Sequence, residues 1–248
     1  MKRCNTLWTG LALASSLITT VDAQAAIALD RTRVIFDGGE KSISLNVSNE
    51  NKQLPYLVQA WLEDPQGKKI NSPMTIVPPL QRVEAGAKSQ VKVQGLAAMA
   101  SLPQDRESLY YFNLREIPPR SDKPNTLQIA LQTRIKLFYR PATIVPDNPS
   151  GMTPWQEKVV LHREGARYKL SNPTPYYVTF VDGSSTGKTS LKEFRPLMVA
   201  PFSSDYLSVS ATQLGTAPVL TYINDYGGHP QLLFSCEGAV CKASPVKK

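Results

Sequence analysis

The sequence predicts an all-β protein built from two antiparallel sandwich domains. Strand-type runs recur at intervals of roughly ten to fifteen residues, and turn sequences such as Asp37-Gly38-Gly39 and Pro118-Pro119 separate them. The chain also holds 20 prolines in 248 residues, and this excess over the usual content of about 5% disfavours long helices. A Pro- and Asn-rich stretch, residues 141–154, divides the runs into two blocks.

The first residues have the composition of a secretion signal. Lys2-Arg3 gives a basic start, residues 7–21 are apolar or small without charge, and Ala23-Gln24-Ala25 fits the small-x-small rule of a signal-peptidase site. A membrane helix is the alternative, but Thr, Ser and Gly dilute the stretch and it ends too early for a span of about 20 residues. We therefore expect residues 1–25 to be cleaved and a soluble chain to start near Ala26.

The first block, residues 26–145, contains six runs with the alternation or the β-branched content of strands. They are Ile27–Phe36, Ser42–Asn49, Tyr56–Leu62, Ser89–Gln94, Leu109–Arg115 and Thr126–Tyr139. The second block, residues 146–248, has six more. They are Lys158–His162, Arg167–Ser171, Tyr176–Val181, Tyr206–Val209, Val219–Ile223 and Gln231–Cys236. Each block is long enough to bury a core of its own.

The run over residues 126–139 is unusual for its length. Its odd positions are apolar with one exception, Thr133, and its even positions are mostly polar or charged. A strand of that length extends about 46 Å at roughly 3.3 Å per residue, whereas ordinary strands have about 5–6 residues. We expect one long strand with a continuous apolar face, and the alternation alone does not say what that face covers.

Two cysteines follow the predicted signal, Cys236 and Cys241. A C-x4-C pair in an exported chain predicts a local disulfide. Zinc is not expected, because the only histidines, His162 and His229, lack metal-site spacing. Redox catalysis is not expected either, because C-x-x-C spacing is absent.

The segment Gly183–Thr189 resembles two catalytic motifs without fulfilling either. It ends in Gly-Lys-Thr like a phosphate-binding loop, but a glycine is missing where Asp182 stands, and no helix pattern follows. It also fits G-x-S-x-G around Ser185, with His229 downstream, but the βαβ alternation of a hydrolase is missing. We interpret it as a turn and expect a binding protein, with no enzyme activity and no cofactor.

The charge of the chain sets few limits on its partners. The formal net charge of +8 permits an acidic partner or an anionic surface. The basic residues are scattered without a run of five, which disfavours nucleic acid.

Several motifs, spread in order along both blocks, carry a resemblance to a known family. They are Leu29–Phe36 (LDRTRVIF), Lys52–Tyr56 (KQLPY), Leu102–Ser108 (LPQDRES), Tyr111–Pro119 (YFNLREIPP), Tyr139-Arg140-Pro141, Asn172–Tyr177 (NPTPYY) and Tyr222–Gly228 (YINDYGG). The chain resembles the periplasmic pilus-assembly chaperones of the PapD-like family over nearly all of its mature length. The resemblance implies two immunoglobulin-like domains set in an L, a place in the periplasm, pilin subunits as ligands and an outer-membrane usher as the assembly partner.

The same resemblance assigns the long strand a role outside its own domain. A pilin of this family lacks the last strand of its sandwich, and the chaperone strand fills the gap with alternate side chains. Leu127, Ile129 and Leu131 match those donor positions, with Asn125 at the end of the series.

Five charged residues also match the family by motif. Arg33 and Lys136 resemble the basic pair that anchors the pilin's C-terminal carboxylate. Glu107, Arg140 and Asp225 resemble an interdomain ion-pair network that orients the domains.

One difficulty concerns the geometry of the long strand. Leu131 and Lys136 have opposite parity, so their two roles need a bulge, a strong twist or different local surroundings between them. Residues 182–213 match the family poorly, and no role is transferred to them.

A secreted immunoglobulin-like pilin or adhesin subunit is the alternative to a chaperone. Such a subunit should lack one strand and carry an N-terminal donor extension, whereas Ala26 leads almost directly into a strand and the first block has a full set. The exposed strand edge of a chaperone would also permit self-association of the free chain.

Overall fold

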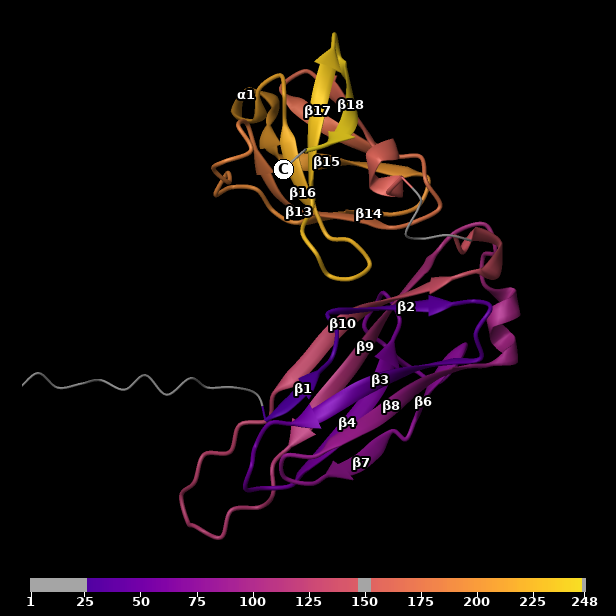
Figure 1. The fold of residues 1–248 in the computed structure, drawn as a ribbon, viewed down its shortest axis with the longest axis vertical. Helices are drawn as coiled ribbons and strands as arrows, with labels where there is room; N and C mark the ends of the chain where they lie inside the picture. Colours follow the sequence, from indigo (N-terminus) through magenta and orange to yellow (C-terminus); the bar gives the residue numbers. More distant parts are fainter. Residues whose placement is uncertain (1–25, 147–152, 247–248) are drawn as a thin grey trace, which may run out of the picture.

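A computed structural model describes residues 26–146 and 153–246. Its strands fall into two domains with separate cores, and Figure 1 shows the two domains meeting at an angle. The all-β class predicted from the sequence is confirmed. The predicted signal, residues 1–25, lies outside the described residues. None of the helices in the described ranges is long and apolar enough to cross a bilayer.

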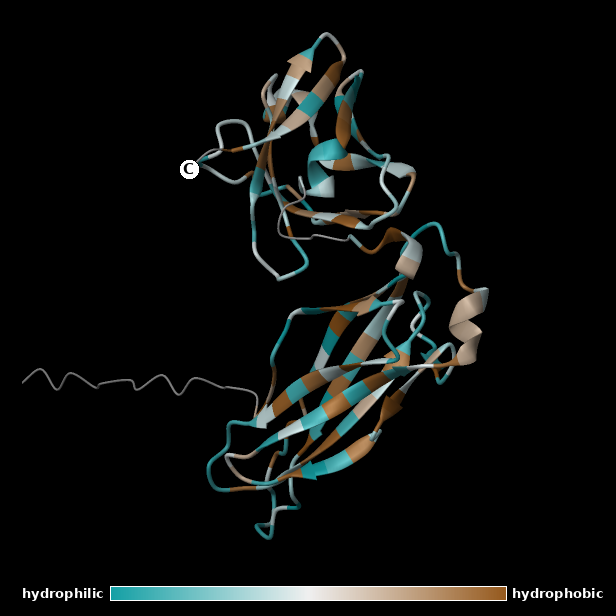
Figure 2. Cartoon of the chain, turned by 45° about the vertical axis from the view of Figure 1, so that its right-hand side comes forward, coloured by the Kyte–Doolittle hydropathy of each residue, from teal (hydrophilic) through white to brown (hydrophobic). Residues whose placement is uncertain are grey.

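The first domain is a sandwich of two sheets. One has the order β1-β3-β8-β6, which are Ile27–Leu29, Ser42–Asn49, Lys88–Gly95 and Met74–Val77. The other has the order β2-β10-β9-β4-β5, which are Arg33–Asp37, Gln132–Arg140, Ser108–Ile117, Tyr56–Glu63 and Lys69–Ile70, and β7 (Leu80–Val83) pairs with β4. Two short 3-10 turns, η1 (Ala97–Ser101) and η2 (Ala142–Ile144), complete the domain. Figure 2 shows the hydrophilic and hydrophobic bands that alternate along its strands.

The predicted first strand, Ile27–Phe36, is divided between the two sheets. β1 pairs antiparallel with β3, whereas β2 pairs parallel with β10. The chain crosses from one sheet to the other at Asp30, whose backbone N–H donates to Asn46 O and whose carboxylate accepts from the Asn46 amide. The prediction of one continuous strand is therefore wrong, and the crossing places β2 beside β10.

The second domain has one continuous sheet that curls around its core. Its order is β14-β13-β16-β17-β18-β11-β12-β15. In chain order the strands are β11 (Val160–Glu164), β12 (Arg167–Asn172), β13 (Val178–Ser184), β14 (Leu197–Val199), β15 (Ser203–Ser210), β16 (Val219–Tyr222), β17 (Gln231–Glu237) and β18 (Val240–Pro245). The 3-10 turn η3 (Trp155–Lys158) precedes them, and the single turn α1 (Ala211–Leu214) follows β15 with a capping box between Ser210 and Gln213.

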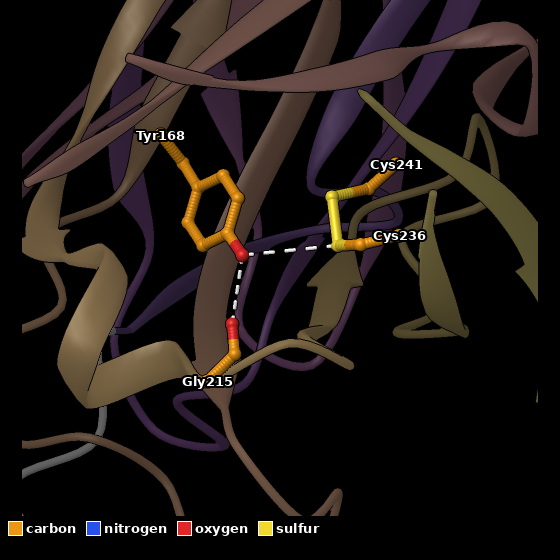
Figure 3. Close-up of a disulfide and its surroundings, with 4 residues drawn as sticks. All are labelled: Tyr168, Gly215, Cys236 and Cys241. Atoms are coloured by element: carbon orange, nitrogen blue, oxygen red, sulfur yellow. Dashed lines mark hydrogen bonds between the residues drawn. A yellow bond between two sulfur atoms is a disulfide. The ribbon is translucent and has the colours of Figure 1, made fainter. Parts of the chain in front are cut away.

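The predicted disulfide is confirmed. Cys236 and Cys241 are direct partners on β17 and β18, and their sulfurs are bonded. Figure 3 shows the buried ring of Tyr168 from β12 beside this bond. The Tyr168 hydroxyl donates to Gly215 O at 2.7 Å and lies 3.7 Å from Cys236 Sγ. The hairpin, β12 and the residue after α1 are thereby held together.

The segment Gly183–Thr189 forms the end of β13 and the start of its connection to β14. The Ser184 hydroxyl accepts from the backbone N–H of Thr186 and of Gly187, as in a local turn. Between β13 and β14 the described residues contain no helix.

Candidate functional site

The long apolar run is a regular strand only in its second half. β10 begins at Gln132, so the predicted strand over residues 126–139 is wrong for residues 126–131. The neighbouring strand β9 ends at Ile117, because Pro118 and Pro119 follow and cannot donate to a ladder. The last contact with β9 is the Glu116 N–H donating to Leu131 O at 3.0 Å. The earlier residues have no strand beside them within the described structure.

The apolar positions of this segment lead from the core of the first domain into solvent. Leu137 is fully buried and Ile135 packs on the core of the first domain. Leu131, Ile129 and Leu127 have the same parity but are 43%, 65% and 84% exposed. Figure 1 shows the connection to β10 projecting from the lower left of the first domain. We call residues 127–131 the exposed stripe.

Asn125, predicted as the end of the donor series, lies just before the exposed stripe. It is exposed and has a left-handed backbone with φ of 56°, in a turn. Asn tolerates that conformation better than most residues. The role assigned to Asn125 stays a prediction, as do the roles of the three apolar residues of the stripe.

One edge of β10 is free beside the exposed stripe. β9 covers the other edge from Gln132 to Tyr139, but β2 pairs only from Lys136 to Arg140. The stretch from Gln132 to Ile135 therefore has an unpaired edge on the side of β2, which is a template for another strand.

The two faces of β10 carry the two predicted roles. No register shift interrupts its pairing with β9 from Gln132 to Tyr139, so no bulge in β10 is needed. Odd positions face the core and, further out, the exposed stripe. Even positions face the second domain: the Phe138 ring lies 5.4 Å from the Tyr177 ring. Leu131 and Lys136 can therefore have different roles despite their opposite parity, because the two faces of β10 have different surroundings.

Arg33 and Lys136 lie side by side as Cα partners on β2 and β10. The Lys136 Nζ donates to Thr179 Oγ1 at 3.4 Å, and an Arg33 Nη donates to Ile223 O at 3.5 Å. The Arg33 Nε is buried without a hydrogen-bond partner. Among the ion pairs of the described residues, neither cation has an acidic partner.

The surroundings of the pair lower both pKa values. Burial, and then the adjacent Arg33 charge, lowers the pKa of Lys136 to about 8. Burial also lowers the pKa of Arg33, against the opposing effect of Asp225. Two like charges that are half-buried without a counter-ion form a site for an anion, and their hydrogen-bond donors suit a carboxylate.

A cleft of about 560 Å³ adjoins Arg33 between the two domains. Ile35 and Asp37 of β2 line one side, and Tyr226 and Gly227 of the β16–β17 loop line the other. The Tyr226 side chain is 87% exposed there.

The structure brings Glu107, Arg140 and Asp225 together at the domain boundary. Arg140 binds Glu107 Oε1 with two N–H groups at 2.7 and 2.9 Å, and Asp225 Oδ2 with a third at 2.9 Å. The second oxygen of Glu107 accepts from the backbone N–H of Tyr177 at 2.7 Å. Arg140 and Glu107 come from the first domain, and the other two residues from the second. That this network orients the domains stays a prediction.

Burial strongly affects the pKa values of the charged groups in this network. It raises the pKa of Glu107 to about 7, because desolvation of the carboxylate outweighs the attraction of Arg140. Burial alone would lower the pKa of Arg140, but Glu107 and Asp225 outweigh it and raise that pKa. The rings of Trp155 and Tyr176 also lie 4.9 Å from the Arg140 guanidinium.

Sequence reasoning missed several residues of this region. Tyr177 and Tyr226 lie in motifs that resemble the family, but the resemblance assigns no role to either. Thr179 and Ile223 contact the cations through a hydroxyl and a backbone carbonyl, and neither group stands out in a sequence. In residues 26–146 and 153–246, no group of three or more His, Cys, Asp or Glu side chains is placed to hold a metal ion.

Comparison with known families matches both domains. The family described as "Pili and flagellar-assembly chaperone, PapD N-terminal domain" matches residues 26–145, and "Pili assembly chaperone PapD, C-terminal domain" matches residues 154–234. The chain is 50% identical over 239 residues to the chaperone protein PapD of Escherichia coli, covering 96% of this chain and 98% of that protein.

Two further proteins are similar along most of their length. The chaperone protein PmfD of Proteus mirabilis is 45% identical over 244 residues, which cover 97% of this chain and 94% of that protein. The crystal structure of the periplasmic chaperone SfaE is 32% identical with a TM-score of 0.67, and the match covers 84% of this chain and 98% of that one.

Proposed function

We propose, because this chain belongs to the PapD family of pili-assembly chaperones, that it binds pilin subunits in the periplasm and delivers them to an outer-membrane usher. The observation that carries the proposal is the continuity of the exposed stripe with β10 and the cation pair. One continuous segment thus holds an apolar surface for an unfinished core, next to a site for a terminal carboxylate.

The exposed stripe fits the open groove of a subunit that lacks a strand. Leu127, Ile129 and Leu131 present alternate apolar side chains, and the backbone before Leu131 has no strand partner in its own sheet. Burying each side chain contributes roughly 1.5–3 kcal/mol. That free energy favours capture without a nucleotide or another cofactor.

The positions of the two sites define the direction of the bound strand. A carboxylate at Lys136 lies about 16 Å from Leu131, at roughly 3.3 Å per residue. A partner strand that ends at Lys136 and passes Leu131 and Leu127 before it therefore runs parallel to β10. β2 already lies parallel on the same edge from Lys136 onward. The partner strand would occupy the free part of that edge, directly before β2.

Anchoring the carboxylate would fix the register of the partner strand. A shift by one residue turns every side chain of a strand to the other face. The cation pair would therefore determine which partner side chains accompany Leu127, Ile129 and Leu131 into the groove.

The periplasmic location is supported by the chemistry of the chain. The predicted secretion signal and the Cys236–Cys241 disulfide both fit an oxidising compartment outside the cytoplasm. The proposed work is binding and transfer, so we expect no bond-making step. The alternative of a pilin or adhesin subunit lacks support, because both sheets of the first domain are built from this chain's own strands.

Co-purification with a pilin tests the proposal. The chain and a pilin would be produced together, and the subunit recovered with the chain from a periplasmic extract would be measured. We expect Arg33→Ala and Lys136→Ala to abolish recovery. Arg82→Ala is the matched control, because Arg82 pairs with the exposed Glu84 and does not line the cleft. Full recovery with both the Arg33 and the Lys136 variant would contradict the anchor.

A further inference from the structure

The β16–β17 loop, residues 224–228, is a compact unit with its own hydrogen bonds. The Asn224 side-chain oxygen accepts from the backbone N–H of Tyr226 at 3.1 Å and of Gly228 at 2.8 Å. The Asn224 N–H donates to Gly228 O at 3.0 Å, and the Gly227 N–H donates to Asn224 O at 3.0 Å. These four hydrogen bonds close the loop into a compact turn.

This loop touches the first domain at three neighbouring points. Asp225 binds Arg140, and the carbonyl of Ile223, just before the loop, accepts from Arg33. The third point is Gly227, which lines the same cleft as Thr32 and Arg33 and has no room for a Cβ beside the Thr32 hydroxyl. Figure 1 shows the loop reaching from the second domain toward β2.

Gly227 is required at the third point for two reasons. Its φ is 81°, a left-handed conformation that favours glycine. A Cβ added there would also lie 2.6 Å from Thr32 Oγ1, closer than such atoms approach. A side chain at this position must displace the Thr32 hydroxyl or move the loop away from it.

Arg33 depends on this loop for its orientation. Its only side-chain hydrogen bond in the described structure is the one to Ile223 O, at the long end of the hydrogen-bond range, and its Nε has no partner. A guanidinium binds a carboxylate well only when its planar fork faces the two oxygens. Ile223 directly precedes the loop, and its N–H donates to Thr179 O on β13 at 3.0 Å. A displaced loop would therefore shift the carbonyl that holds the fork.

We propose that the β16–β17 loop is a positioning element for the anion site, and that Gly227 packed against Thr32 sets the distance at which Ile223 O holds Arg33. This inference rests on the proposed function of Arg33 as a carboxylate anchor. It assigns Gly227 and Asn224 a part in subunit binding that acts through the position of Arg33.

Peptide binding separates this role from a general structural one. The probes are a peptide copied from the C-terminal strand of the co-purified pilin, with a free carboxylate, and the same peptide as a C-terminal amide. Affinity for each is measured with the full chain, and the ratio of the two affinities reports the anchor alone. We expect the native chain to prefer the carboxylate by about tenfold or more, the value of a charge-assisted hydrogen bond.

Gly227→Ala should reduce this preference to less than about threefold while affinity for the amide peptide stays unchanged. Gly165→Ala is the matched control, since Gly165 also has a positive φ, 62°, but no atom within 4 Å of an added Cβ. It should retain the preference. The double variant Thr32→Ala with Gly227→Ala should restore it, because the close atom is gone.

A second pair of variants keeps the test informative if Gly227→Ala does not fold. Asn224→Ala removes the acceptor for Tyr226 and Gly228 and should lower the preference, whereas Asn224→Asp retains an acceptor and should restore most of it. Circular dichroism and melting temperature identify the variants that are folded.

Three results would overturn the inference. If Gly227→Ala and Asn224→Ala keep the native preference for the carboxylate peptide, the loop has no role in positioning Arg33, while the anchor itself still stands. Gly227→Ala could lose the preference without rescue by Thr32→Ala, which refutes the contact as the cause. A native chain without any preference for the carboxylate would refute the anchor in the proposed function as well.

Discussion

Arg33 and Lys136 are Cα partners across β2 and β10, the one parallel pair of strands in the described ranges 26–146 and 153–246, and both side chains face the second domain. Two half-buried cations side by side cost stability, because they repel each other and lose hydration. A group held at such a cost is a candidate for function.

Removing the charge of Lys136 should therefore raise the stability of the free chain but abolish its binding to a pilin. We expect Lys136→Met to raise the free energy of unfolding of the free chain by about 1 kcal/mol, a value discounted for the part of the side chain that is exposed. The same variant should fail to recover pilin. Urea unfolding and co-purification measure the two effects, and a variant that is both less stable and inactive would point to a structural role.

Subunit binding should weaken in alkaline solution. The pKa of Lys136 is lowered to about 8, so the ammonium is present below that pH and lost above it. A bound carboxylate favours the ammonium, so binding is strongest below pH 8 and falls as the pH rises through that value. Titration of a carboxylate peptide between about pH 6.5 and 9.5 measures this.

Lys136→Arg provides the control for this pH dependence. Its guanidinium stays charged over the whole range, so the curve should become flat. An equal alkaline loss in Lys136→Arg would assign the titration to another group.

The exposed stripe should respond to changes on one face only. Ile129→Glu places a charge where we expect an apolar groove and should weaken subunit binding by about 10- to 150-fold, the equivalent of 1.5–3 kcal/mol. Because Ile129 is exposed, the melting temperature of the free chain should not change. Gln128→Glu, one position away on the other face, should bind almost normally. Similar losses in both variants would argue against strand-like insertion.

Loss of Glu107 should loosen the domain boundary. Glu107→Ala leaves Arg140 and the Tyr177 N–H without their buried partner, and such a break costs about 3–5 kcal/mol. Thermal unfolding measures the loss, and small-angle scattering measures the accompanying change in domain arrangement. An unaltered scattering curve would show that the network does not orient the domains.

The Glu107 carboxyl also predicts a pH dependence of stability. Its pKa in the folded chain is raised to about 7 from 4.5, so the folded chain binds more protons between those values. Its contribution to the free energy of unfolding therefore falls as the pH rises through this window, by on the order of 1.4 kcal/mol per pH unit, and is constant above it. Glu107→Gln should remove this slope, and a slope that persists in Glu107→Gln would belong to another group.

The sequence predicted the fold class, most strands and the disulfide, because alternation and turn residues are local properties. The sequence did not predict the features that depend on which strands lie beside one another. Residues 126–131 alternate as well as the rest of the run, but a strand needs a neighbour, and Pro118-Pro119 ends β9 before it can supply one. Ile27–Phe36 is extended throughout, but only the assembled sandwich shows that the chain changes sheets near Asp30.

The candidate site was predictable only in its charged and apolar side chains. The resemblance to a known family predicted the roles of Arg33, Lys136 and the network around Arg140. The contacts made by Thr179 and by the carbonyl of Ile223 depend on how the two domains meet. No pattern within one segment encodes such a contact, and the same holds for the approach of Gly227 to Thr32.

Backbone amide hydrogen exchange in a chaperone–pilin complex tests the central claim most directly. In the free chain the amides of residues 126–131 have no strand partner, so they should exchange rapidly. In the complex we predict strong protection of these amides and of the unpaired edge from Gln132 to Ile135. Rapid exchange at residues 126–131 in a complex that is otherwise intact would contradict the claim that this segment completes the subunit's fold.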